Sequence, residues 1–215
     1  SILSQTFEDF ELLLLNDAST DNSEEIIKKF TDPRLKYFSN KKNLGISGSR
    51  NRLMDLASGE YLAIMDNDDL SLPDRLRKQV EFMDKNPEVA MLGSWGKLFC
   101  KFPPSPGFFG RLKQRFINLG WIWCQPEHPG INDMLRGNPV MHSSSMLRRQ
   151  ALVRDNIRYN PSYTPAEDFD LCRQILAAGW KLANLSEVLF LYHYHGGNFS
   201  LKNKQSMRFA DRKVK

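Results

Sequence analysis

The chain has 215 residues and a formal net charge of +5, which suits one α/β domain with a sizeable core and leaves too little chain for two. Apolar residues make up 41% and charged residues 26%, as in ordinary globular proteins, and no apolar run approaches the roughly 20 residues that span a bilayer. The mild positive charge allows attraction to anionic lipid or phosphate-bearing substrates but does not call for a nucleic-acid partner. The three cysteines lack metal-like spacing and are expected to be reduced thiols in a cytosolic protein.

Alternating strand and helix patterns fill the first 96 residues. Apolar runs predict strands at 10–15, 34–38, 61–65 and 88–95. Apolar residues at helical spacing predict helices at 23–30, 46–57 and 72–83, with a glycine or proline soon after each end. This order predicts an α/β fold with a mostly parallel, Rossmann-like sheet and helices on both faces.

Carboxylates follow the strand predicted at 61–65 at the point where it ends. The run YLAIM leads directly into Asp66, Asp68 and Asp69, and open α/β sheets bind ligands at the carboxyl ends of their strands. Asp66 and Asp68 would project to one side of an extended backbone. Two such hard oxygen ligands suit Mg²⁺ or Mn²⁺, with water and substrate phosphates completing the shell. The alternative is a solvated acidic turn in which an aspartate or Ser71 caps the next helix.

Residues 97–139 interrupt the alternating pattern. A cluster rich in proline lies at 103–107, and aromatic residues are interspersed with Arg111, Lys113 and Arg115. This composition favours an acceptor-binding segment or a membrane-surface contact. The alternative is a helix–loop excursion that buries its own aromatic residues.

Regular structure is expected again after this segment. A strand-like run lies at 140–147, and the sequence TPAE at 164–167 predicts a capping box with proline first in a helix that runs to Gly179. A last strand is predicted at 187–194, and a basic tail follows at 201–215.

Six short motifs follow one another along the chain. They are NDASTD at 16–21, NLG at 43–45, DNDD at 66–69, PDRL at 73–76, NPVMH at 138–142 and ED at 167–168. In this order they resemble the motifs of family 2 glycosyltransferases with the GT-A fold, over residues 1 to about 100 and 137 to 200.

The resemblance implies a metal-dependent, inverting glycosyltransferase. Such an enzyme moves a sugar from a nucleotide diphosphate sugar, UDP-linked by family frequency, to a hydroxyl group of a saccharide or lipid-linked acceptor in cell-surface polysaccharide synthesis. The implied partners are the donor and the acceptor, with no nucleic acid. The implied location is the cytoplasm, with a peripheral contact to the inner membrane surface as a further expectation.

The resemblance also assigns metal and nucleotide roles to particular positions. In the family the aspartates at the strand end hold Mn²⁺ or Mg²⁺ on the diphosphate, which implies Asp68 as principal ligand and Asp66 as a metal, sugar, ribose or water-mediated partner. The earlier motif contacts the nucleotide base, which implies Asp17. Asn16 stands where an aspartate is commoner, so it keeps hydrogen-bonding capacity without the charge. Arg50 matches a family arginine near the nucleotide, although a surface ion pair is its alternative role.

The same resemblance makes Asp168 the general base, with Glu167 in reserve. Transfer requires a base to deprotonate the acceptor hydroxyl. Both carboxylates would lie in a first helical turn, where the helix dipole lowers a carboxyl pKa and where they could serve as capping residues only. Burial in a closed sugar site near Glu167 and Asp170 would raise the pKa again.

The histidines near the last strand give a weaker signal. His195 precedes a Gly-Gly pair at 196–197 that would form a mobile lid over the donor. A metal or diphosphate contact and a structural hydrogen bond are both open to His195, whereas His193 and His195 lack further residues at zinc-site spacing.

Two other classes of protein share parts of this pattern. A haloacid dehalogenase-type phosphatase also ends a strand in Asp-x-Asp but usually has Thr or Val where this chain has Leu70. A non-catalytic nucleotide- or carbohydrate-binding module could use the same fold. A binding module needs no base, so the pair formed by Asp68 and Asp168 argues against it.

The expected organisation is one GT-A domain in several parts. Residues 1–96 would bind the nucleotide sugar, 97–139 would be a variable segment that contacts acceptor or membrane, 140–200 would supply the catalytic part, and 201–215 would be a basic tail. The family's first strand is missing from the start of this chain. We therefore expect the natural protein to carry an extra segment of about 20–30 residues.

Overall fold

A computed structural model describes residues 1–101, 107–195 and 198 of the chain. Most of the proline-rich cluster at 103–107, the Gly-Gly pair expected to form a lid, and the basic tail expected at 201–215 lie outside the described residues. Within the described residues, no helix is both long and apolar enough to cross a membrane.

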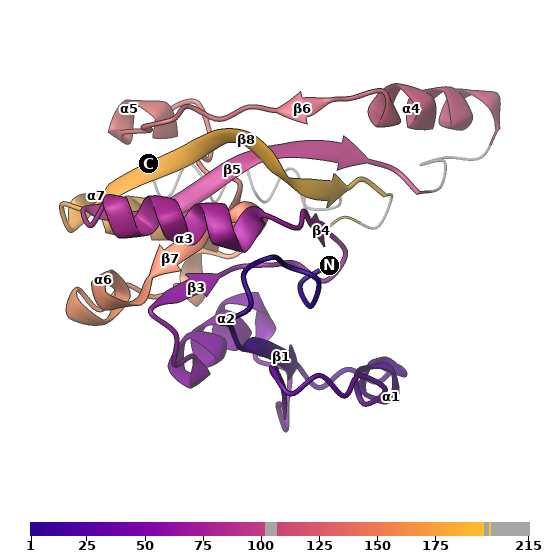
Figure 1. Cartoon of the computed structure of the whole chain (residues 1–215), viewed down its shortest axis with the longest axis horizontal. Helices are drawn as coiled ribbons and strands as arrows, with labels where there is room; N and C mark the ends of the chain where they lie inside the picture. Colours follow the sequence, from indigo (N-terminus) through magenta and orange to yellow (C-terminus); the bar gives the residue numbers. More distant parts are fainter. Residues whose placement is uncertain (102–106, 196–197, 199–215) are drawn as a thin grey trace.

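A six-stranded mixed sheet forms the centre of the molecule (Figure 1). Its strand order is β3–β7–β5–β8–β4, and β6 pairs with β5 beside this row. Its strands are β3 (Tyr61–Ala63), β4 (Leu70–Ser71), β5 (Val89–Phe99), β6 (Ile122–Trp123), β7 (Met146–Arg148) and β8 (Lys181–His193). A separate two-stranded sheet holds β1 (Leu12–Asn16) and β2 (Leu35–Ser39).

The predicted α/β class is confirmed, and its parallel character is partial. Strands β5 and β8 pair in parallel from Val89 opposite Lys181 to Phe99 opposite His193, and β1 pairs in parallel with β2. The pairs β3–β7, β5–β7, β5–β6 and β4–β8 are antiparallel. The antiparallel strands β4 and β6 were not visible in the sequence, because two residues carry no periodic pattern.

Helices cover both faces of the six-stranded sheet, as predicted. The helices are α1 (Ser23–Ile27), α2 (Gly45–Leu56), α3 (Arg75–Lys85), α4 (Phe108–Asn118), α5 (Ile131–Met134), α6 (Arg149–Arg154) and α7 (Glu167–Ala177). Neighbouring residues of β5 point to opposite faces, so Met91 packs with Leu171 of α7 in one core cluster. Leu92 packs with Leu76 and Met83 of α3 in the other. The sheet thus holds α3 on one face and α7 on the other, and the polar side chains discussed below come from the turn after β3 and the start of α7.

Three local predictions were wrong. The strand at 61–65 ends at residue 63, and the chain then turns, with Asp69 N donating to Asp66 O, so alternation along an extended backbone does not orient the aspartates. Ser71 belongs to β4, where it pairs with Phe190 of β8, and the next helix begins only at Arg75. The capping box at 164–167 does not form, since α7 begins at Glu167 without a side-chain cap.

Candidate active site

The acidic turn after β3 sends its carboxylates in different directions. Asp66 Oδ1 lies 3.3 Å from Arg50 Nη2, and its Oδ2 accepts a hydrogen bond from Ser143 Oγ. Asp68 Oδ2 lies 2.9 Å from His195 Nε2 on the segment that follows β8. The turn therefore contacts two different parts of the chain, and Asp66 and Asp68 serve separate neighbours.

Asp69, the third carboxylate of the turn, is buried against β8. Its Oδ1 accepts a hydrogen bond of 2.8 Å from His193 N. Burial raises the pKa of Asp69 to about 7, and the charges of Asp68 and Asp66 act in the same direction. Asp69 thus fastens the acidic turn to the strand that leads to His195.

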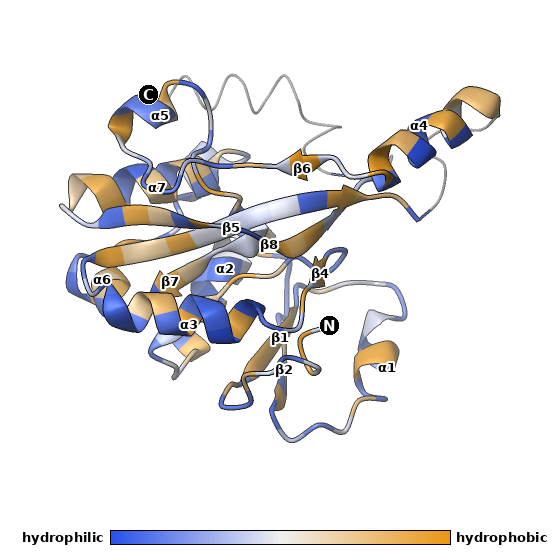
Figure 2. Ribbon diagram, turned by 45° about the horizontal axis from the view of Figure 1, so that its top comes forward, coloured by the Kyte–Doolittle hydropathy of each residue, from blue (hydrophilic) through white to orange (hydrophobic). Residues whose placement is uncertain are grey.

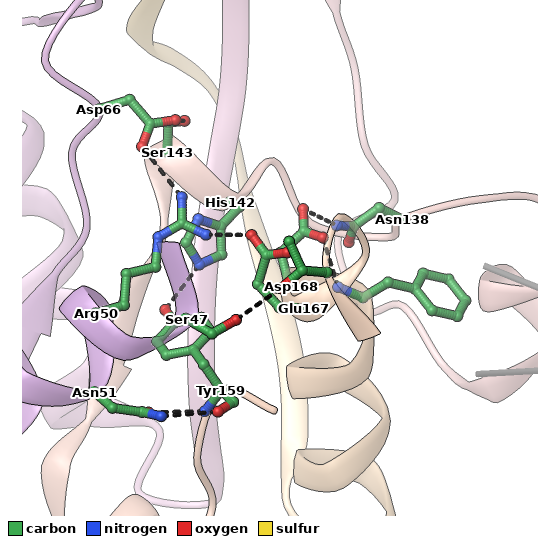
Figure 3. A network of polar contacts seen from close by, with 12 residues as sticks. Ser47, Arg50, Asn51, Asp66, Asn138, His142, Ser143, Tyr159, Glu167 and Asp168 are labelled. Carbon is green, nitrogen blue, oxygen red and sulfur yellow. Dashed lines mark hydrogen bonds and ion pairs between the residues drawn. The ribbon is translucent and has the colours of Figure 1, made fainter. Parts of the chain in front are cut away.

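Arg50 of α2 lies at the centre of the polar network drawn in Figure 3. Its Nη1 donates to Glu167 Oε1 at 2.8 Å, while Nη2 faces Asp66. Its guanidinium group also lies 5.5 Å from the centre of the Tyr159 ring, within the range of a cation–π contact. A single cation therefore joins α2, the acidic turn and the start of α7.

Tyr159 connects Arg50 to Asn51 and His142. Its backbone exchanges two hydrogen bonds with the Asn51 side chain, at 2.8 and 2.9 Å. Its hydroxyl lies 2.8 Å from His142 Nε2, and burial keeps the pKa of His142 well below its usual range. His142 is therefore neutral at pH 7 and adds no charge beside Arg50.

Asp168 lies next to the arginine-bound Glu167, but its hydrogen-bond donors among the described residues are neutral. Asn138 Nδ2 donates to its Oδ2 and Phe169 N to its Oδ1, both at 2.8 Å. Burial raises the pKa of Asp168 to about 6, the Glu167 charge raises it further, and Arg50 partly opposes both. A carboxylate with this pKa is ionised at neutral pH and is a stronger base than an ordinary aspartate. The effect of burial thus exceeds that of the helix terminus at this position.

Glu167 differs from Asp168 in its partners. Its Oε1 binds Arg50, and its Oε2 is buried without a hydrogen-bond partner among the described residues. Arg50 thus occupies one oxygen of Glu167, whereas Asp168 combines neutral hydrogen-bond donors with a raised pKa. Of the two neighbours, Asp168 is therefore the better candidate for the proton acceptor.

Asp17 and Asn16 lie at the end of β1 and contact another set of residues. Asp17 accepts hydrogen bonds from the backbone of Leu44 at 2.9 Å and Gly45 at 3.0 Å, and from Asn40 Nδ2 at 2.6 Å. Burial alone would raise the pKa of Asp17, but these hydrogen bonds lower it. Asp17 thus satisfies the free N–H groups at the start of α2. The same helix carries Arg50, so α2 connects the two groups of predicted site residues.

Both polar atoms of the Asn16 side chain have a hydrogen-bond partner. Its Oδ1 accepts a hydrogen bond from Ser19 N at 2.8 Å, and its Nδ2 donates to Tyr37 Oη at 3.2 Å. An amide supplies both the acceptor and the donor that these contacts need, which an ionised aspartate cannot do. This pairing explains why an uncharged residue fits at the end of β1.

Asp68 and His195 are the residues best placed to hold a metal ion. Their oxygen and nitrogen donors converge at 2.9 Å, and both side chains are half-exposed. No group of three or more His, Cys, Asp or Glu side chains with metal-site geometry occurs in the part of the chain that the structure describes. Two protein ligands suit Mn²⁺ or Mg²⁺ bound mainly through water and substrate phosphates, and an imidazole nitrogen favours the first of these ions.

Several partners of the site were not identified from the sequence as functional residues. Ser143 reaches Asp66 across 77 positions, and Tyr159 lies in a segment without a regular pattern. Asn138 stands in the motif at 138–142, and that motif is the one sequence signal for its place beside Asp168.

Comparisons with known proteins identify the family of the chain. The family described as "Glycosyl transferase family 2" matches residues 1–154. An uncharacterized glycosyltransferase of Haemophilus influenzae is 33% identical over 222 residues, which cover 100% of this chain and 66% of the relative. The Escherichia coli protein WfaP, described as a UDP-Glc:alpha-D-GlcNAc-diphosphoundecaprenol beta-1,3-glucosyltransferase, is 28% identical over 200 residues, which cover 93% of this chain and 72% of WfaP.

Solved structures share the fold. Staphylococcus aureus TarS 1-349 in complex with UDP-GlcNAc superposes with a TM-score of 0.65 at 18% identity, covering 96% of this chain and 58% of TarS. The mannosyltransferase PcManGT from Pyrobaculum calidifontis, in complex with GDP-Man and Mn²⁺, gives 0.64 at 18% identity, covering 94% and 53%. These likenesses confirm the predicted GT-A fold. The chain spans 66% of the H. influenzae relative and 63% of an uncharacterized glycosyltransferase of Methanocaldococcus jannaschii.

Proposed function

The chain belongs to glycosyltransferase family 2, and we propose that it transfers a sugar from a nucleotide diphosphate sugar to an acceptor hydroxyl with inversion at the anomeric carbon. The observation that carries the proposal is the pair of adjacent carboxylates at the start of α7. Arg50 binds Glu167, whereas Asp168 has a raised pKa and neutral hydrogen-bond donors in the part of the chain that the structure describes. This difference supports Asp168 as the base for a hydroxyl nucleophile.

The base step follows from the surroundings of Asp168. Asn138 and the Phe169 amide orient its carboxylate through one hydrogen bond on each oxygen. The acceptor hydroxyl gives its proton to Asp168 as its oxygen bonds to the anomeric carbon from the face opposite the diphosphate. The bond between that carbon and the diphosphate breaks, and the electron pair leaves with the nucleoside diphosphate.

Glu167 and Arg50 would position the sugar. The buried Glu167 Oε2 lacks a donor among the described residues, and an unmatched buried acceptor is costly. A hydroxyl group of the donor sugar would satisfy it. Arg50 places one positive charge between Glu167 and Asp66, which offsets part of the negative charge that an anionic diphosphate would meet.

The residues of the acidic turn fit a divalent ion on the diphosphate. Asp68 and His195 would hold Mn²⁺ or Mg²⁺, which when bound would neutralise the leaving group. Asp66 is already held by Arg50 and Ser143, which suits a water-mediated or sugar-binding role. Asp17, with Asn16 fixing the loop around it, would contact the nucleotide base at the other end of α2.

The relatives favour a UDP-linked donor and a lipid-linked acceptor. WfaP is described as using UDP-Glc and a diphosphoundecaprenol-linked GlcNAc, and TarS was solved with UDP-GlcNAc. A reaction of this kind would place the enzyme in the cytoplasm at the inner membrane surface, in cell-surface polysaccharide synthesis. Residues 1–96 would then hold the donor, 140–200 the reacting hydroxyl, and 97–139 would face acceptor or membrane.

A binding and hydrolysis panel tests the proposal. UDP or GDP, with and without Mn²⁺, should raise the melting temperature if the donor site is correct, and release of the nucleotide from a UDP-sugar should require Asp168. Family membership disfavours the phosphatase alternative, so p-nitrophenyl phosphate should not be hydrolysed. Nucleotide binding without any sugar release or transfer would indicate a non-catalytic binding module instead.

A further inference from the structure

Helix α4 and the residues after it expose an unusually apolar surface. The helix projects from the body of the protein beyond the end of β5, with apolar residues on its outer end (Figure 2). Phe108 and Phe109 are 74% and 81% exposed. We call the following set the aromatic surface: Phe108, Phe109, Leu112, Phe116, Leu119, Trp121, Ile122 and Trp123, all of them exposed.

Helix α4 contacts the protein mainly through polar side chains. Gln114 Nε2 donates to the carbonyls of Cys100 at 3.1 Å and Lys101 at 2.9 Å. Asn118 exchanges two hydrogen bonds with the Cys100 backbone, at 2.8 and 3.0 Å. A surface helix of a globular protein normally turns its apolar stripe to the core, but on α4 only Ile117 among the large apolar residues is buried. The other large apolar residues of α4 are exposed, so packing within the described residues does not explain them.

Positive charge borders the aromatic surface. Arg111, Lys113 and Arg115 lie on α4, and Lys97 and Lys101 precede it. On a helical projection, Arg111 and Arg115 lie on one side of the apolar stripe and Lys113 on the other. The sequence holds no Asp or Glu between Glu88 and Glu127. The surface therefore offers aromatic insertion and cationic contact together.

We propose that the aromatic surface docks on the interface of an anionic lipid bilayer. Aromatic and leucine side chains on one face of a helix, with basic residues along its edges, are the features that bury such a helix at the boundary of headgroups and acyl chains. Trp121 and Trp123 suit the headgroup level because their rings are amphipathic. Long basic side chains can reach the phosphates while their methylene groups stay in the apolar layer.

Charge distinguishes the bilayer from a second copy of the chain. Two aromatic surfaces packed against each other would bring together two acid-free, basic segments, and like charges at close range repel. Anionic lipid instead attracts each basic residue near the surface. The complementary occupant is therefore an anionic membrane.

The docking surface is joined to the proposed donor site by direct contacts. Lys113 Nζ donates to Tyr194 Oη at 3.0 Å, and the Phe99 ring stacks on His193 at 4.8 Å. The next histidine, His195, meets Asp68. A bilayer in contact with α4 would thus lie near the segment that carries His193 and His195. The inference deepens the proposed function and rests on it only for the lipid-linked acceptor that docking would bring within reach.

Vesicle flotation of the 215-residue chain, without nucleotide, tests the proposal. The chain should float with phosphatidylglycerol-rich vesicles at low salt, bind less as salt rises, and stay in solution with phosphatidylcholine alone. A fluorophore on Cys124, the exposed one of the three cysteines, should shift to the blue on binding because it follows Trp123. Equal flotation with neutral vesicles, or no flotation with anionic ones, would overturn the proposal.

Matched variants locate the contact. F109S/F116S should weaken vesicle binding by about tenfold or more per inserted phenylalanine, whereas F30S, at an exposed phenylalanine after α1, should not. R111Q/R115Q should weaken binding roughly 25-fold, from about fivefold per basic residue near an anionic leaflet. K28Q/K181Q removes two exposed charges elsewhere and should have little effect; equal losses in both charge variants would contradict a localised surface.

Two further measurements distinguish membrane docking from a failure of the donor site and from dimerisation of the chain. F109S/F116S should bind UDP–Mn²⁺ by calorimetry as the unchanged chain does, so failure of docking and failure of the donor site are distinguishable. In sedimentation equilibrium, the unchanged chain should not form a dimer that F109S/F116S dissociates. A concentration-dependent dimer lost in F109S/F116S, together with no vesicle binding, would assign the surface to a second copy and overturn the bilayer proposal.

Discussion

Arg50 donates a 2.8 Å hydrogen bond to Glu167, which lies 117 positions further along the chain. The side chains of Arg50 and Glu167 are 20% and 7% exposed. The pair therefore joins α2 to α7 inside the protein and neutralises one of the two carboxylates at the start of α7. Asp168 forms no ion pair with a described residue, which is why adjacent acidic residues can serve different roles.

Arg50→Ala should destabilise the protein strongly. The substitution leaves Glu167 and Asp66 without their shared cation, and breaking a buried ion pair typically costs about 3–5 kcal/mol. Urea unfolding measures the loss. Arg50→Ala combined with Glu167→Gln should recover much of it, because the buried charge of Glu167 is then removed together with its partner. A loss in the double variant equal to the sum of the losses in Arg50→Ala and Glu167→Gln would show that the pair is not coupled.

Asp168→Asn should slow turnover without impairing donor binding. The amide is nearly isosteric but cannot accept the proton, and removal of a general base usually costs ~10²-fold or more. Turnover of a nucleotide-sugar donor and calorimetric affinity for UDP–Mn²⁺ are the two measurements. Glu167→Gln is the matched control, since it should affect donor binding more than the base step. Turnover in Asp168→Asn close to that of the unchanged enzyme would remove Asp168 from the base role.

The raised pKa of Asp168 also predicts a pH dependence. The ionised form is the base, so activity should rise as pH increases through about 6 and level off above it. Because folding favours the protonated form of this carboxyl, its contribution to stability is most favourable at low pH and declines as pH rises through the folded pKa. Asp168→Asn should therefore raise the melting temperature at pH 8 more than at pH 4. An activity profile that stays flat from pH 5 to 8 would contradict the assignment.

The fold was predictable where apolar residues repeat regularly. The strand expected at 88–95 is the first part of β5, and the helix expected at 46–57 is α2, displaced by one residue at each end. Strands β4 and β6 were not predictable from their own residues, because each has two residues and forms only against a longer partner strand. Tertiary pairing, rather than local propensity, creates such elements.

The site was predictable in composition but not in geometry. The motif at 66–69 identified the carboxylates, yet Ile64 N bonds to Ser145 O and the chain then turns away from an extended course. His195 reaches Asp68 across 127 positions. No local pattern encodes a contact over that separation, so only the folded sheet reveals which aspartate faces which partner.

Asp68→Ala should abolish the Mn²⁺-dependent part of UDP binding and leave the fold intact. Asp68 is half-exposed in a turn, so its loss creates no cavity, and the expected ion loses its principal oxygen ligand. His195→Ala should weaken the same Mn²⁺-dependent binding less, since water can replace one nitrogen donor. Calorimetry with UDP, with and without Mn²⁺, measures both effects, and the melting temperature of the free chain serves as the control. Asp69→Ala is a control for a residue that supports the turn without binding the metal. The Asp69 carboxylate accepts a hydrogen bond from His193 N, so its loss should lower the stability of the fold but should not remove a metal ligand. An unchanged affinity of Asp68→Ala for UDP–Mn²⁺ would move the metal site away from the acidic turn.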